Sequence, residues 1–154
     1  MLQAPVGDQY KTMILSGDVM NSSKPFIEQV LQAGVPVLGY NGAWDGASID
    51  LACPMPGVDR ACPSHIGVVG AAVSEPLYAA LEWDGNEAFK STPRAPWKVQ
   101  PTDTEVAGFV SEIRVGASRF ARAVVRRAGH ILPADNPAAA FDMIDRFILG
   151  RGWE

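Results

Sequence analysis

Two polar side chains of this 154-residue chain are placed where acid–base chemistry could occur. His130 follows Gly129 in a turn directly after the β-forming run 120–127, and histidine is the side chain that changes charge near neutral pH. Asp45 comes a few residues after the apolar run 35–40. Open α/β sheets gather their chemistry beyond the carboxyl ends of strands, so these residue types could form a proton-transfer pair if the two runs are neighbouring strands.

Both residues also have plainer explanations. Aspartate and glycine are what any tight turn uses, and Asp45 stands between Gly42 and Gly46. His130 could instead satisfy a buried carbonyl group. The pattern around each residue leaves these alternatives open.

The elements that must position this pair can be predicted from periodicity. A helix over residues 23–33 ends at Gly34 and leads into a buried parallel strand at residues 35–40. A further extended segment is expected at residues 105–115, followed by the strand at 120–127. Asn136 and Pro137 suit the N-cap and the first position of the last helix, whose apolar residues recur at three- and four-residue steps: Ala138, Phe141, Ile144, Phe147 and Ile148.

The stretches between these elements are less regular. Residues 68–83 are helical in pattern, with Pro76 as the expected helix start, and residues 84–101 are predicted to form an ordered connection. The whole pattern predicts an α/β fold of which the chain holds the C-terminal part of the sheet with flanking helices, in one partial domain over residues 1–154. Residues 51–69, rich in Pro, Gly and Cys, are predicted to be a loop insertion.

Composition excludes several classes of partner and site. The net charge of −4 makes nucleic acid and an anionic membrane surface unexpected partners, and no apolar run is long enough for a membrane span. The first residues lack a signal-peptide pattern. Cys53 and Cys62 could form a local disulfide or remain free thiols; together with His65 they fit no zinc spacing. We expect no metal and no cofactor.

Several segments, taken in order, resemble the C-terminal part of the serine carboxypeptidases, a peptidase branch of the α/β-hydrolase fold. Residues 37–45, VLGYNGAWD, are similar to the family's YNGxxD strand motif, and residues 128–140, AGHILPADNPAAA, to its AGHMVPxDQP histidine motif. Further similarity lies in residues 16–20, residues 81–83, Phe89 with Trp97, and residues 141–147. The resemblance covers most of the chain from Gly17 onward.

The resemblance implies roles for three residues. Asp45 would be the acid and His130 the base of a Ser-Asp-His triad, in the order along the chain that α/β-hydrolases use. Ile131, where the family has Met, would line the pocket for the leaving residue. The substrate would be the C-terminus of a peptide, and the location the secretory pathway, the lysosome or vacuole, or the extracellular space.

The chain also departs from the family pattern. Ala43 replaces an acidic or polar residue, and the segment between acid and base is longer through residues 51–69. Gly-Ala-Ser at residues 46–48 and 116–118 begins the nucleophile pattern Gly-x-Ser-x-Gly, but Asp50 and Phe120 stand where its last glycine is required.

We therefore expect the nucleophile to lie outside this chain and the chain alone to be inactive, with the missing N-terminal half as a partner. A carboxypeptidase-like acyltransferase fragment and a non-catalytic, partner-binding half-domain are the alternatives.

Overall fold

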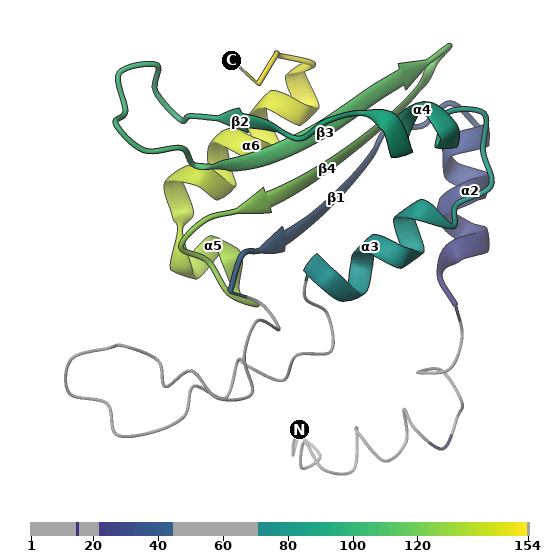
Figure 1. The fold of residues 1–154 in the computed structure, drawn as a ribbon, viewed down its shortest axis with the longest axis horizontal. Helices are drawn as coiled ribbons and strands as arrows, with labels where there is room; N and C mark the ends of the chain where they lie inside the picture. The colour runs from purple at the N-terminus through teal and green to yellow at the C-terminus, as the bar shows by residue number, and fades with distance from the viewer. Residues whose placement is uncertain (1–14, 16–21, 45–70, 154) are drawn as a thin grey trace, which may run out of the picture.

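The computed structural model describes residue 15, residues 22–44 and residues 71–153. The described elements are α2 (Lys24–Gln32), β1 (Val37–Gly42), α3 (Ala71–Ala79), α4 (Asn86–Ser91), β2 (Ala95–Trp97), β3 (Gly108–Val115), β4 (Ser118–Val125), α5 (Leu132–Asp135) and α6 (Pro137–Leu149) (Figure 1). The strands form one sheet in the order β1-β4-β3-β2. Strands β1 and β4 are parallel, while β3 pairs antiparallel with both β4 and β2.

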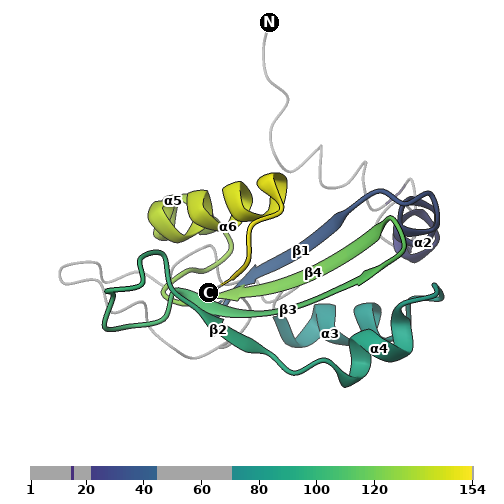
Figure 2. The ribbon, with the colours of Figure 1, turned by 90° about the horizontal axis from the view of Figure 1, so that it is seen from above.

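Helices cover both faces of this sheet. Figure 2 shows α5 and α6 on one face and α3 and α4 on the other. Successive side chains of β4 point to opposite faces, as the pleat requires. Ala123 and Val125 pack with Met143 of α6, whereas Phe120 packs with Leu31 of α2 and the α3–α4 region. The described part is a mixed α/β structure, consistent with part of an α/β-hydrolase fold, as predicted.

The β3–β4 hairpin corrects one expectation about the sheet. The parallel arrangement expected for residues 35–40 holds for β1 and β4 but does not extend to β3, because Val115 pairs with Ser118 across a two-residue turn. Gly116 has a φ of +58°, the left-handed conformation that lets so short a turn match the strand twist. The Ser118 hydroxyl donates to the carbonyl of Leu31. This Gly-Ala-Ser segment is therefore a hairpin turn and not the start of a nucleophile turn.

Helix α3 corrects a second expectation. The helix begins at Ala71, and Pro76, the expected start, lies inside it. Proline removes one helical hydrogen bond, but packing on the sheet holds the helix together. Its Glu75 is ion-paired with Arg122, a β4 side chain that is 3% exposed, and also accepts a bond of 2.8 Å from Arg94. Tyr78 packs edge-on against the Phe120 ring at 5.5 Å.

Residues 84–101, predicted to be an ordered connection, contain the short helix α4 and the edge strand β2. Trp97 of β2 is buried, and its indole N–H donates to Asp142 of α6 over 3.1 Å. Pro96 on this strand is compatible with an edge position, because an edge strand has one side without ladder bonds. The connection is therefore ordered, as predicted, and the buried Trp97 holds it against α6.

Glu112 of β3 fastens the C-terminal tail to the sheet. Its carboxylate accepts hydrogen bonds from Arg119 (2.6 Å), Arg114 (3.0 Å) and the indole of Trp153 (2.7 Å). Burial raises the pKa of this carboxyl, but the three donors outweigh burial and hold the pKa of Glu112 below its ordinary value. Trp153 also packs edge-on against Trp97 at 5.6 Å.

Candidate active site

His130 lies in the loop between β4 and α5, and it is exposed. The loop is held from both sides of the histidine. The Gly129 N–H donates to the Asp135 carboxylate over 2.7 Å, and the Asn136 amide donates to the carbonyl of Arg126 over 3.0 Å. Because the loop is hydrogen-bonded on both sides of His130, its backbone is held in one position. A general base needs such a fixed position to stay within reach of the proton that it takes.

Asn136 also begins helix α6, as predicted. Its side-chain oxygen accepts the N–H of Ala139 over 3.3 Å, and Pro137 follows at the start of the helix. Gly150, with φ of +67°, ends the helix. One side chain therefore caps α6 and closes the histidine loop.

The end of β1 is bonded directly to this loop. Ala43 N–H donates to the carbonyl of Val125 over 2.7 Å, and Trp44 N–H donates to the carbonyl of Ala128 over 3.0 Å. Gly42 makes the approach possible, because a Cβ there would fall on the carbonyl oxygens of the histidine loop. Asp45, the predicted acid, comes next in the chain and lies outside the described residues.

Ile131, the predicted contact for the leaving residue, is 59% exposed beside His130. Trp44 is 55% exposed at the end of β1. The adjoining Leu132 is buried and anchors α5 in the core. An exposed apolar side chain next to the histidine is compatible with the expected role of Ile131, which stays a prediction.

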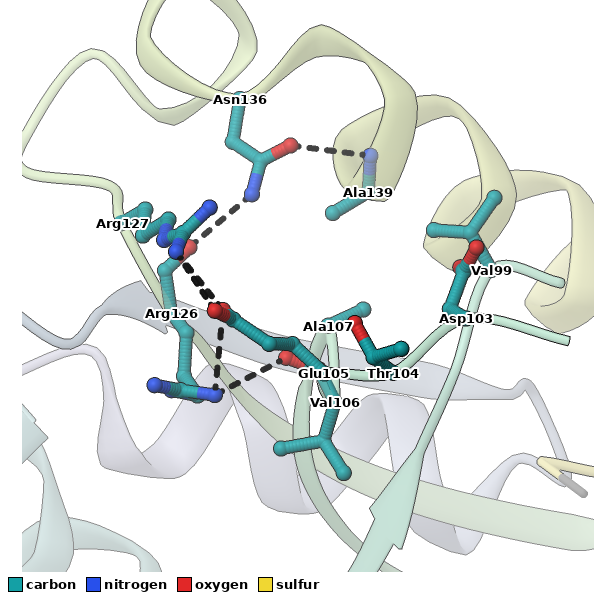
Figure 3. Close-up of a pocket in the computed structure, with 10 residues that line it drawn as sticks. All are labelled: Val99, Asp103, Thr104, Glu105, Val106, Ala107, Arg126, Arg127, Asn136 and Ala139. Atoms are coloured by element: carbon teal, nitrogen blue, oxygen red, sulfur yellow. Dashed lines mark hydrogen bonds and ion pairs between the residues drawn. The ribbon is translucent and has the colours of Figure 1, made fainter. Parts of the chain in front are cut away.

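A hollow of about 300 Å³ opens beside the base of the histidine loop (Figure 3). It is lined by residues from the β2–β3 connection, the end of β4 and the start of α6: Val99, Asp103, Thr104, Glu105, Val106, Ala107, Arg126, Arg127, Asn136 and Ala139. The Arg126–Arg127 pair is visible in the sequence, but no sequence pattern indicated that it lies close to residues 103–107. This site could not be found from pattern alone.

The other candidates fall outside the described residues. Cys53, Cys62 and His65, and with them the predicted insertion 51–69, lie in a part of the chain that is not described. Within residues 22–44 and 71–153 no three His, Cys, Asp or Glu side chains come together as a metal site. No helix in that same part is both long and apolar enough to cross a membrane.

The mixed sheet with helices on both faces, and the histidine loop beyond a strand's carboxyl end, are consistent with part of an α/β-hydrolase fold. The family model for serine carboxypeptidases matches residues 8–150, and the chain belongs to that family. It is 37% identical over 140 residues to a probable serine carboxypeptidase of Mus musculus, which covers 91% of this chain.

Two further relatives extend the comparison. A probable serine carboxypeptidase of Dictyostelium discoideum is 34% identical over 134 residues (87% of this chain), and a pheromone-processing carboxypeptidase of Phytophthora infestans is 30% identical over 122 residues (79%). The chain spans only 24%, 22% and 16% of the mouse, Dictyostelium and Phytophthora proteins.

Proposed function

We propose that this chain supplies the acid and the base of a serine carboxypeptidase that releases C-terminal amino acids from peptides. The observation that carries the proposal is the bond from Trp44 N–H to the Ala128 carbonyl. It ties the residue before Asp45 to a residue two positions before His130. With family membership, this supports a pair in which Asp45 accepts the Nδ1 proton of His130 and Nε2 acts as the base.

The proposed reaction has two steps. In the first, His130 Nε2 takes the proton of a serine hydroxyl, whose oxygen bonds to the carbonyl carbon of the last peptide bond. That bond breaks, and the C-terminal amino acid leaves with the proton from His130 on its nitrogen. In the second, His130 takes a proton from water, whose oxygen displaces the serine from the acyl group, and the proton returns to the serine.

The serine must come from outside these 154 residues, since no Gly-x-Ser-x-Gly segment is present. We propose that the partner is the nucleophile-bearing part of the carboxypeptidase fold. The edge of β1 supports this: within the described part, β1 pairs only with β4. Exposed apolar side chains lie on both flanking helices, Phe26 on α2 and Phe141 with Ile148 on α6.

A chimera tests the proposal. Residues 8–150 replace the matched segment of the mouse relative, and release of the last amino acid from a blocked dipeptide is measured. We expect turnover in the chimera and none with the 154-residue chain alone. His130→Ala and Asp45→Asn should each lower kcat about 10⁴-fold or more, while Lys90→Gln, on the exposed surface of α4, should not.

The proposal fails if the chimera folds but keeps its activity after His130→Ala, or if the purified chain alone shows serine-dependent turnover. Product analysis with an added alcohol separates hydrolysis from acyl transfer. By the same family resemblance we propose a location in the secretory pathway, the lysosome or vacuole, or outside the cell, which cell fractionation would test.

A further inference from the structure

The hollow beside the histidine loop carries opposite charges on its two sides. Figure 3 shows Arg126, Arg127 and Glu105 on one side and Asp103 with Thr104 on the other. The start of α6 spans the space between them. This arrangement is independent of His130, which does not line the hollow.

The arginine side has a surplus of positive charge. Arg127 and Arg126 lie 2.8 Å and 3.7 Å from the same Glu105 carboxylate oxygen, so two cations share one anion. Arg126 also lies within 3.5 Å of the Val106 carbonyl. The side chains of Arg127 and Arg126 are 64% and 42% exposed, and each guanidinium has five N–H donors, so donors remain for a ligand.

The backbone at Arg127 holds this arrangement at some cost. Its φ of +56° is the left-handed conformation, and no other non-glycine residue in the described part adopts it. Such a conformation is unfavourable for a residue that bears a side chain, and it marks places where the surroundings fix the chain. Here it turns Arg127 toward Glu105 while the chain continues into the histidine loop.

The opposite side has a surplus of negative charge. One oxygen of the Asp103 carboxylate accepts the Gln100 N–H over 2.9 Å, which fixes the group in the β2–β3 connection. No ion pair to Asp103 is found among the described residues, so no cation in that part of the chain compensates its charge. The hollow therefore has one positive surplus and one negative surplus facing each other.

The volume of the hollow and its apolar lining residues restrict the class of ligand further. A volume of about 300 Å³ is at the lower end of small-molecule sites, which run to roughly 1,000 Å³. Val99, Val106 and Ala139 add apolar surface between the charged sides. A small molecule with one cationic group, one anionic group and a short apolar part matches all three properties.

We propose that the hollow binds a free α-amino acid in its zwitterionic form. Its carboxylate accepts hydrogen bonds from Arg126 and Arg127, its ammonium group lies at Asp103 and Thr104, and its side chain meets the apolar lining. If the proposed peptidase function holds, this is the class of product that the enzyme releases. The binding itself does not depend on that function.

The test is calorimetric titration of the 154-residue chain with three probes. L-leucine has both charges, N-acetyl-L-leucine lacks the ammonium group, and L-leucinamide lacks the carboxylate. We expect L-leucine to bind and the other two to bind about tenfold more weakly or worse, because each loses a charge-assisted interaction. Absence of L-leucine binding, or equal binding of N-acetyl-L-leucine, overturns the proposal.

Variants locate the site. Arg127→Gln and Asp103→Asn should each weaken L-leucine binding about tenfold or more. Arg151→Gln is the matched control, because Arg151 is an exposed arginine paired with Asp145, which lies outside the hollow. His130→Ala should leave binding unchanged; if it abolishes binding while Arg127→Gln does not, the ligand occupies the catalytic site and the proposal is wrong. Circular dichroism confirms that each variant remains folded.

Discussion

Replacing Asn136 should loosen the histidine loop and destabilise the fold by an amount that can be divided between two bonds. In Asn136→Ala, α6 loses its cap to Ala139, worth about 1 kcal/mol. The loop loses its bond to the Arg126 carbonyl, worth about 1 kcal/mol more. The sum of about 2 kcal/mol corresponds to a fall in Tm of roughly 4–8 °C for a chain of this size.

Asn136→Asp separates the two contributions. A carboxylate still accepts the Ala139 N–H and favours the start of a helix, but it has no donor for the Arg126 carbonyl. We expect a loss of about 1 kcal/mol, which is half that of the alanine variant. Both variants should be compared with the unsubstituted chain by urea unfolding and by thermal unfolding.

Amide hydrogen exchange shows whether the loop itself responds. The Gly129 N–H bonds to Asp135, so its exchange should speed up in both variants if the Asn136 bond holds the loop. Equal stability of the aspartate and alanine variants, or a loss below about 0.5 kcal/mol for alanine, would refute the division into two bonds.

Three other predictions concern the surroundings of the loop. Gly42→Ala should cost about 1–3 kcal/mol or more in urea unfolding, because its methyl group meets backbone oxygens, whereas Gly152→Ala, with open space, should change stability little. The pKa of Glu112 is lowered in the folded protein, so its contribution to the free energy of unfolding is present above pH 4.5, the ordinary pKa of a glutamate, and is lost as the pH falls through the folded-state pKa. Glu112→Gln should therefore flatten the acid side of the curve of stability against pH. Glu75→Gln leaves the buried Arg122 without a carboxylate and should lower the free energy of unfolding by about 1–3 kcal/mol. The loss is smaller than for a fully buried pair because Glu75 is partly exposed. A loss below about 0.5 kcal/mol would show that solvent takes the place of the Glu75 carboxylate.

The helices and strands could be predicted where a local sequence signal, such as a capping residue or an apolar run, marks the element. Helix α2 ends at Gln32, two residues before Gly34 with its φ of +76°, and α6 begins at Pro137 after its N-cap Asn136, both close to where the sequence indicated. Strand β1 was found because a short apolar run followed by a turn is typical of a buried strand. Helix α4, with six residues, is too short to show a period, and the pairing partner of β3 depends on a turn of two residues at Gly116.

The candidate site was predictable in a different way. The position of His130 beyond a strand followed from local pattern, and its proposed role followed from resemblance. The hollow could not be predicted, because residues 103–107 and Arg126 are separated in the chain and meet only through the β3–β4 pairing. Local patterns do not encode which strands become neighbours, so a site built across the hairpin leaves no signal in spacing.

Strand β4 supplies both sites, and Asn136 joins them. The strand leads into Arg126 and Arg127, which line the hollow, and then into His130. Asn136 lines the same hollow and donates to the Arg126 carbonyl, so the bond that closes the histidine loop is also part of the hollow's wall. A ligand that stiffens this wall should slow Gly129 exchange in the unsubstituted chain, and Asn136→Ala should remove that effect because the connecting bond is gone.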